Sequence, residues 1–192
     1  MKVQSYQECV KRTNVDLGSD KLNIAHMALG IASELAEIVE CVTKKDIDLT
    51  NLEEEIGDGF WYGFNYANIR NIEILDNIFD IEFSHGDLND ITQYGGELAD
   101  IAKRLLAYGQ SFEAQEEKRH SCSKKFFMTE EEILNKYLNS LGALAKYNGL
   151  NPEVIMGKNI TKLYIRYKDK FSEDAALVRD LEAERLVLEQ TK

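Results

Sequence analysis

The chain has 192 residues, of which 44% are hydrophobic and 30% are charged. Its 34 acidic and 23 basic residues give a formal net charge of -11. This negative field repels a phosphate backbone, so nucleic acid is not an expected partner. A small phosphorylated ligand stays compatible with the charge where metal ions supply the missing positive charge. The length suits one compact domain that covers residues 1–192.

Cysteine content and hydropathy indicate a soluble, cytoplasmic protein. Cys9, Cys41 and Cys122 form no CxxC pair, and an odd number of cysteines cannot close a disulfide framework, which suits a reducing compartment. The N-terminus has no apolar signal core, and no apolar run approaches the length needed to cross a bilayer. We therefore expect no membrane partner.

The apolar residues recur with a helical period along most of the chain, and alternating patterns typical of strands are hard to find. The predicted fold class is all-α. The predicted helices cover residues 3–14, 20–44, 50–68, 88–108, 130–147, 152–171 and 173–190. The segment "IEILDNIFDIEF", residues 72–83, fits either a helix or an extended connector, and "QEEKRHSCSKK", residues 115–125, is typical of a solvated loop.

Several helix ends carry recognisable capping residues. A Ser or Thr followed three residues later by Glu forms a capping box, Asn before Pro marks a helix start, and Gly marks a helix end. The predicted caps are the boxes Thr50 with Glu53 and Thr129 with Glu132, Asn151 before Pro152, Ser172, and the C-terminal glycine Gly109.

Two acidic pairs stand out on the second and third predicted helices. Glu34 and Glu37 are three residues apart, as are Glu55 and Asp58, so each pair lies on one helical face. The short connection "KDIDLT" would place the two helices side by side and antiparallel, with the pairs facing each other. Four converging carboxylates repel one another unless cations are present, and Mg²⁺ prefers oxygen ligands.

Any single acidic pair is most simply interpreted as ordinary surface acids. The surroundings of these two pairs favour a metal site instead. Both pairs are embedded in apolar residues, in "IASELAEIV" and "EEEIGDGFWY". Their small neighbours Ser33, Ala36, Gly57 and Gly59 would allow a helix or a ligand to approach closely.

The same residues resemble a known family. "HMALGIASELAEIVE" followed by "NLEEEIGDGFWYGFNYA" is similar to the MazG-like nucleoside triphosphate pyrophosphohydrolases of the all-α NTP pyrophosphatase superfamily, which is related to the dimeric dUTPases. The family signature is Glu-x-x-Glu on one helix and Glu-x-x-Asp on the next. Glu34, Glu37, Glu55 and Asp58 match it. The resemblance implies a hydrolase that uses Mg²⁺, or Mn²⁺ as a substitute, to split a triphosphate between the α and β phosphates into a monophosphate and pyrophosphate.

A second block, residues 149–185, is similar to the C-terminal region of that family. Asn159, Lys162 and Arg166 fall where the relatives carry polar and basic residues associated with the substrate. The chain departs from the family in two places. Ser33 stands where many relatives have a further glutamate, and residues 68–148 are inserted relative to compact relatives.

The insertion echoes the first acidic unit. "GELADIAKRLLAYG" resembles "SELAEIVECVTK", and "EEILNKYLNSLGALA" resembles "EEIGDGFWYGFNYA". A degenerate repeat would give units at about 20–68 and 88–147, followed by C-terminal helices at 151–190. Convergent amphipathic patterning would give the same echo, and both interpretations stay open. The echo aligns Glu97, Asp100, Glu132 and Asn135 with the four acidic residues of the first unit.

The residues also suggest catalytic roles. Glu34 and Glu37 are the candidate catalytic residues, with Glu37 as the candidate general base because a water activated by metal would lie close to it. Lys162 and Arg166, four residues apart, could neutralise the outgoing pyrophosphate. Tyr62 could border the nucleotide, and a packed tyrosine with a solvated hydroxyl would fit the position equally well.

Three further side chains near these positions suit structural roles better. Phe60 and Trp61 are expected in the core. His26 is expected to be a hydrogen-bonded structural residue.

The sequence leaves a second class of function open. A protein that keeps the fold but sequesters a nucleotide or a partner would carry the same motifs, whereas an acidic interaction module without a nucleotide leaves the apolar setting of the carboxylates unexplained. Apolar faces on so many helices favour a homodimer, although a repeat within one chain could cover the same faces internally.

Overall fold

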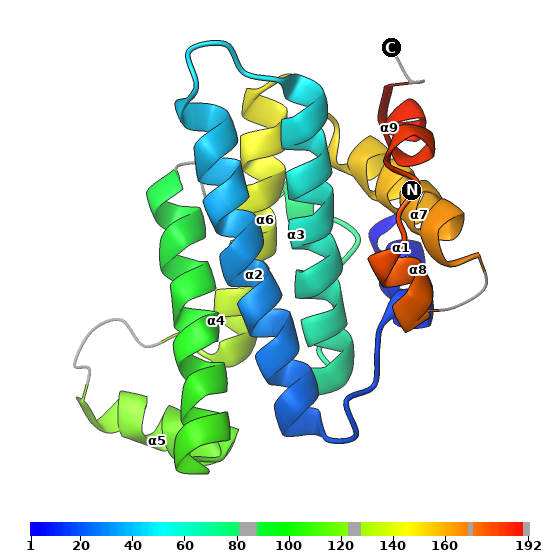
Figure 1. Cartoon of the computed structure of the whole chain (residues 1–192). Coiled ribbons are helices and arrows are strands. Elements are labelled where there is room, and N and C mark those ends of the chain that lie inside the picture. The colour runs from blue at the N-terminus through cyan, green and yellow to red at the C-terminus, as the bar shows by residue number, and fades with distance from the viewer. Residues whose placement is uncertain (81–87, 123–127, 169–170, 190–192) are drawn as a thin grey trace.

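The structure is a computed structural model that describes residues 1–80, 88–122, 128–168 and 171–189. Within these ranges the regular elements are helices and no strand occurs, which confirms the all-α class (Figure 1). The helices are α1 Val3–Val10, α2 Asp20–Thr43, α3 Leu49–Arg70, α4 Leu88–Tyr108, α5 Phe112–Cys122, α6 Glu130–Tyr147, α7 Pro152–Tyr167, α8 Glu173–Leu177 and α9 Leu181–Glu189, with short 3-10 turns η1 Lys11–Thr13 and η2 Ile78–Asp80.

Four long helices form the centre of the molecule. α2 lies between α3 and α4, and α6 contacts α3 and α4 on the other side (Figure 1). Neighbouring helices in this bundle run antiparallel. Their aliphatic and aromatic side chains form one buried core together with side chains of α1 and α7. The pairs α2–α3 and α4–α6 correspond to the two halves of the echo in the sequence, and whether they arose by duplication stays a hypothesis.

A second group of helices covers one flank of α3. α7 contacts α1, α3 and α9, and both termini lie on this flank (Figure 1). Tyr6 of α1 is fully buried there, and its hydroxyl donates to Asn159 Oδ1 of α7 at 2.8 Å. The C-terminal helices are thereby placed next to the helical pair that carries the acidic residues.

Two glycines allow the bundle helices to approach closely. A Cβ atom on Gly30 of α2 would lie 2.1 Å from the ring of Tyr62 on α3. A Cβ atom on Gly95 of α4 would lie 2.3 Å from Leu35 Cδ1 of α2. Such distances are far shorter than van der Waals contact, so these positions leave no room for a larger residue.

Most predicted caps are present, and one is wrong. Thr129 and Glu132 form the reciprocal capping box, the side chains of Asn151 and Ser172 cap α7 and α8, and Gly109 follows α4 with φ +65°. The box of Thr50 and Glu53 does not form. Asp48 caps α3 instead, accepting from the backbone N–H groups of Thr50 and Asn51, while Glu53 binds Lys158.

Some helix bounds differ from the prediction. The first helix passes into a 3-10 turn after Val10, and η2 is the regular element in the described part of the ambiguous segment 72–83. Residues 112–122 form α5, so the predicted loop at 115–125 is wrong over its described part, and residues 123–125 lie outside the described residues. The predicted last helix is divided, because the side chain of Asp180 accepts from the N–H of Ala183 and starts α9 anew.

α2 has a composition that the sequence analysis misjudged. In the described part of the chain, it is the one helix long and apolar enough to cross a membrane by length and composition alone. The expectation that no segment meets this criterion is therefore wrong. Half of the apolar stretch is buried in the protein, because α2 packs against both α3 and α4. A central helix of a bundle meets the same criterion.

Candidate active site

The structure brings three of the four predicted acidic residues into one cluster. Glu34 and Glu37 project from α2 and Glu55 from α3, and each offers a carboxylate oxygen such that all three oxygens lie within 4.8 Å of one another. Glu34 and Glu55 are buried, whereas Glu37 is exposed. We refer to Glu34, Glu37 and Glu55 as the acidic cluster. Its exposed member gives the cluster an open side.

Asp58, the fourth predicted ligand, faces α7 instead. Both of its carboxylate oxygens lie 2.7 Å from Nζ of Lys162, and Asn159 Nδ2 donates to Oδ1 at 2.7 Å. Gly57 permits this contact, since a Cβ atom there would lie 3.3 Å from Asn159 Cβ. Asp58, Asn159 and Lys162 therefore join α3 to α7 beside the acidic cluster.

The acidic cluster is electrostatically unfavourable as it stands. Burial, and then the charges of Asp58, Glu55 and Glu37, raise the pKa of Glu34 to about 8. Burial and the neighbouring charges of Glu37 and Asp58 likewise raise the pKa of Glu55 to about 7. Closely spaced carboxylates favour protonation because each ionisation opposes the next. Bound cations would relieve the same repulsion.

The donor set fits a magnesium ion. Carboxylate oxygens are the ligands that Mg²⁺ prefers, and the ion commonly keeps several waters beside one or two carboxylates. The acidic cluster could supply these oxygens from Glu34, Glu37 and Glu55. Asp58 could join them only by giving up part of its contact with the ammonium of Lys162.

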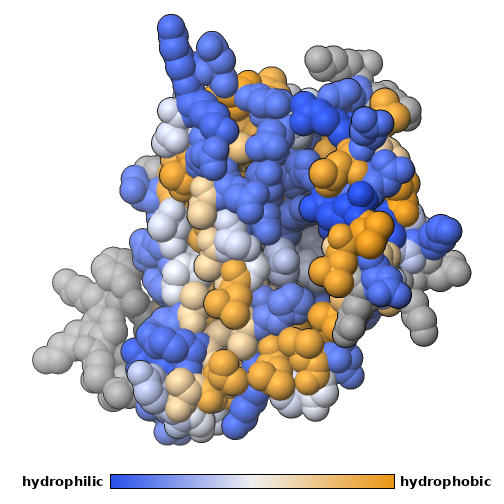
Figure 2. Space-filling view, in the orientation of Figure 1, coloured by the Kyte–Doolittle hydropathy of each residue, from blue (hydrophilic) through white to orange (hydrophobic). Residues whose placement is uncertain are grey.

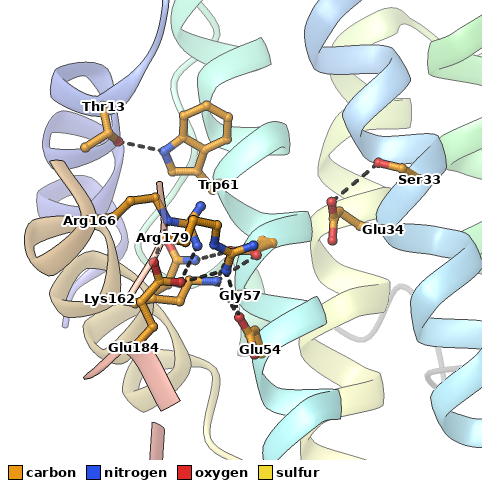
Figure 3. Close-up of polar contacts among 12 residues, drawn as sticks. Thr13, Ser33, Glu34, Glu54, Gly57, Trp61, Lys162, Arg166, Arg179 and Glu184 are labelled. Carbon is orange, nitrogen blue, oxygen red and sulfur yellow. Dashed lines mark hydrogen bonds and ion pairs between the residues drawn. The ribbon is translucent and has the colours of Figure 1, made fainter. Parts of the chain in front are cut away.

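The cations next to the acidic cluster belong to the C-terminal half of the chain. Lys162 is fully buried, and it also reaches Glu54 Oε1 at 3.2 Å. Burial acts to lower the pKa of Lys162, but Asp58 and Glu54 outweigh it and raise that pKa, so the ammonium stays charged. Figure 3 shows Lys162 and Arg166 on the α7 side of α3, with Glu34 across on α2.

A cavity of about 120 Å³ opens between α2, α3 and α7, next to the acidic cluster. Its walls combine carboxylates, one arginine and several aromatic rings. The lining residues are Thr13, Val15, His26, Glu34, Asp58, Trp61, Tyr62, Leu163, Arg166, Tyr167 and Phe171. Burial raises the pKa of Tyr62 to about 12, so its hydroxyl keeps its proton. Small-molecule sites commonly combine aromatic side chains with a few placed polar groups, and this cavity has both.

Two residues for which the sequence suggests structural roles also line the cavity. Phe60 is in the core as expected, and Trp61 packs against the core and lines the cavity, where its Nε1 donates to Thr13 Oγ1 at 2.9 Å. His26 also lines the cavity, and its buried Nδ1 has no hydrogen-bond partner among the described residues. Burial lowers the pKa of His26, so the ring is neutral at neutral pH.

Arg166 also lies at the cavity, as part of an ion pair that the sequence analysis missed. Its Nε and Nη2 donate to the two carboxylate oxygens of Glu184 on α9, at 2.9 and 2.5 Å. Glu184 is 2% exposed. A signal was present in the sequence, because Glu184 lies four residues before the buried Leu188 and so on the apolar face of the last helix. The contact between two segments 18 residues apart follows only from their packing.

The echoed acidic residues form no second cluster in the described part of the chain. Glu97 accepts from Gln93, and Asp100 pairs with Lys103 and Arg104 on its own helix. Glu132 is used in its capping box, and Asn135 donates to the carbonyl of Glu131. These contacts are local to α4 and α6, so the second helical pair lacks the acidic arrangement of the first.

Comparison with known proteins agrees with this geometry. Residues 23–82 match the family model of the MazG nucleotide pyrophosphohydrolase domain. No curated protein and no solved structure matches the chain. The matched segment contains α3, nearly all of α2, and all four acidic residues of the predicted signature. The helical pair that carries the acidic cluster is therefore similar to the MazG nucleotide pyrophosphohydrolase domain.

Proposed function

We propose that this protein is a magnesium-dependent hydrolase that cleaves nucleoside or deoxynucleoside triphosphates between the α and β phosphates, with Mn²⁺ as an alternative metal. The observation that carries the proposal is the acidic cluster of Glu34, Glu37 and Glu55, which lies beside the cations Lys162 and Arg166. An anionic metal site next to fixed cations suits a substrate that is itself a polyanion.

The acidic cluster would hold the metal and prepare the attacking water. When bound, Mg²⁺ supplies the positive charge that screens the triphosphate and makes water a better nucleophile. The oxygen of water bonds to the α phosphorus, the bond from that phosphorus to the bridging oxygen breaks, and pyrophosphate leaves with the electron pair. Glu37 is the proposed proton acceptor, because it is the exposed member of the cluster and water can reach it.

Lys162 and Arg166 of α7 would stabilise the phosphates from the side of Asp58 that faces away from the acidic cluster. Lys162 is charged, buried and fixed by Asp58 and Glu54, so it would act on the phosphates through a fixed positive charge. Arg166 lines the cavity and offers a planar group that suits phosphate. Asn159 is a positioning residue in this proposal. It donates a hydrogen bond to Asp58 and accepts one from the hydroxyl of Tyr6.

The cavity would take the nucleoside. Trp61, Tyr62 and Tyr167 contribute aromatic surface to it, and aromatic rings stack on nucleobases without strong preference for one base. Because Glu34 and Asp58 also line the cavity, a nucleoside there would bring its phosphates to the acidic cluster.

One observation favours a second candidate function, a nucleotide-binding protein with little or no catalysis. Asp58 is held by Lys162 through both carboxylate oxygens, which leaves three carboxylates for metal. A site that binds nucleotide but binds its metal ion weakly would hold the nucleotide without hydrolysing it.

The test is a panel of the common ribo- and deoxynucleoside triphosphates incubated with Mg²⁺ or Mn²⁺, with products identified by chromatography. We expect a nucleoside monophosphate and pyrophosphate from at least one substrate. Glu37→Gln and Asp58→Asn should lower kcat by at least about a hundredfold while the protein stays folded. Glu40→Gln is the matched control, because Glu40 is an exposed acid on the same helix. Tight binding without any product would favour the binding protein instead.

A further inference from the structure

Glu184 holds the arginine of the cavity in one orientation. The contact is a fork in which Nε and Nη2 of Arg166 each meet one oxygen of the same carboxylate. Such a bidentate pair fixes both the position and the plane of the guanidinium. Burial acts to raise the pKa of Glu184, but the hydrogen bonds from Arg166 and Arg179 outweigh it and lower that pKa to about 2. The pair is therefore ionised throughout the neutral range.

The Arg166–Glu184 pair is one end of a row of alternating positive and negative charges that reaches Asp58, next to the acidic cluster. Arg179 Nη2 donates to Glu184 Oε2 at 2.6 Å and lies 3.9 Å from Glu54 Oε1. Glu54 in turn binds Lys162, which binds Asp58. Figure 3 shows Arg166, Arg179 and Lys162 close together, with Glu184 and Glu54 beside them. Glu184 thus separates two guanidinium groups that would otherwise repel each other.

Separate contacts dock the helix that carries Glu184. Lys158 Nζ of α7 donates to the carbonyl of Leu188 at 2.7 Å and to Glu53 Oε2 of α3 at 2.8 Å. Leu188 is 3% exposed. α9 is therefore fixed to α7 and α3 at a point one helical turn beyond Glu184, without help from Arg166. The carboxylate is a fixed anchor on which the flexible arginine is ordered.

We propose that Glu184 is a positioning residue of the active site, which orders Arg166 so that its guanidinium can receive the triphosphate. The inference rests on the proposed function and extends the site to α9. Without the carboxylate, Arg166 would have to give up side-chain freedom each time it bound substrate, and it would be repelled by Arg179. The experiment separates this role from the opposite one, in which Glu184 masks Arg166 and competes with phosphate. The two roles predict effects of opposite sign.

The experiment measures binding apart from turnover. The probes are the α,β-methylene analogues of ATP, GTP, CTP and UTP, in which carbon replaces the oxygen of the scissile bond, and the readout is calorimetric Kd with Mg²⁺ present. The variants are Glu184→Gln, Glu184→Asp, Arg166→Gln and the double variant Glu184→Gln with Arg166→Gln. Glu182→Gln is the matched control, because Glu182 is an exposed acid on the same helix. KM and kcat are measured in parallel on the best substrate of the panel.

Positioning predicts that Glu184→Gln weakens analogue binding and raises KM by about tenfold, a typical loss for a charge-assisted hydrogen bond. Glu184→Asp should fall between Glu184→Gln and the wild type. In the Arg166→Gln background, the Glu184→Gln change should have an effect below about twofold, because Glu184 acts through Arg166. A purely structural role would not produce that coupling.

Each other outcome contradicts the inference in a recognisable way. Tighter binding by Glu184→Gln would establish masking. An unchanged Kd in Glu184→Gln and Glu184→Asp, or an undiminished effect in the Arg166→Gln background, would overturn positioning. If Glu184→Gln does not fold, the Kd of Glu184→Asp and that of the double variant Glu184→Asp with Arg166→Gln decide in the same way. A wild-type protein that binds none of the analogues and turns over no substrate would instead refute the proposed function.

Discussion

Glu34 and Glu55 show at the scale of single residues how a site can weaken the fold that carries it. Both side chains are buried, and each is surrounded by further acids. Their raised pKa values mean that the folded protein resists ionising them. The same repulsion would favour the binding of a divalent cation under the proposed function, since metal and proton would compete for the same oxygens.

The substitution Glu34→Gln should therefore stabilise the metal-free protein. At pH 8 in EDTA, we expect the free energy of unfolding to rise by about 1 kcal/mol, after allowing for solvent screening of the half-open cluster. Activity should be lost. Urea unfolding followed by circular dichroism measures the change, and Asp46→Asn, at an exposed acid in the α2–α3 connection, controls for net charge. A less stable Glu34→Gln variant would mean that repulsion does not dominate at this site.

Helix packing explains why some predictions at the scale of elements succeeded and others failed. The box of Thr129 and Glu132 was predictable because its hydrogen bonds join residues three apart in the sequence. The box predicted at Thr50 had the same local pattern. It fails because Glu53 pairs with Lys158, which is 105 residues away, while Asp48 supplies the cap. A buried ion pair between helices takes precedence over a local cap.

The contact between α2 and α3 gives a prediction at the same scale. Gly30→Ala should reduce the free energy of unfolding by about 2 kcal/mol, because the added methyl group would overlap the ring of Tyr62. The substitution should also impair nucleotide binding, since Tyr62 lines the cavity. Gly96→Ala is the control: it lies inside α4 with no atom within 4 Å of an added Cβ, and should stabilise by about 0.5 to 1 kcal/mol. Equal stabilities of the two variants would refute the close contact.

At the scale of the whole molecule, the site lies where two bodies of helices meet. The bundle supplies the acidic cluster, and the flank formed by α1, α7 and α9 supplies the cations (Figure 1). The face shown in Figure 2 is hydrophobic at its lower end, where α2 begins, and Leu22 and Leu29 of α2 are exposed. The homodimer expected from apolar helix faces stays a prediction.

The stability of the whole protein should depend on pH and magnesium together. The pKa values of Glu34 and Glu55 lie above the ordinary 4.5, so the folded state binds more protons than the unfolded state between pH 4.5 and about 8. Their contribution to stability is complete below pH 4.5 and is lost as pH rises through 7 to 8. The lowered pKa of His26 acts in the opposite direction, but its effect is complete above pH 6.5.

We therefore expect the Tm of the protein in EDTA to fall by several degrees between pH 6.5 and 8.5. Millimolar Mg²⁺ should restore the Tm, with the larger effect at the higher pH, because metal binding no longer has to displace protons. Scanning fluorimetry over this range provides the measurement. The Tm of the Glu34→Gln variant should depend less on pH. If its Tm falls as steeply as that of the wild type, groups other than Glu34 cause the pH dependence.

The fold class, most helix bounds, and the acidic pairs with their spacing could be predicted from the amino-acid sequence, because these follow from interactions within about four residues along the chain. The sequence also puts Asn159, Lys162 and Arg166 on one helix. Which of these residues meet depends on the packing of the helices. Asp58 faces Lys162 and Asn159 while three glutamates cluster, and Glu184 from the last helix orders Arg166. Contacts between distant segments depend on the angles and spacing of packed helices, which local patterns do not encode.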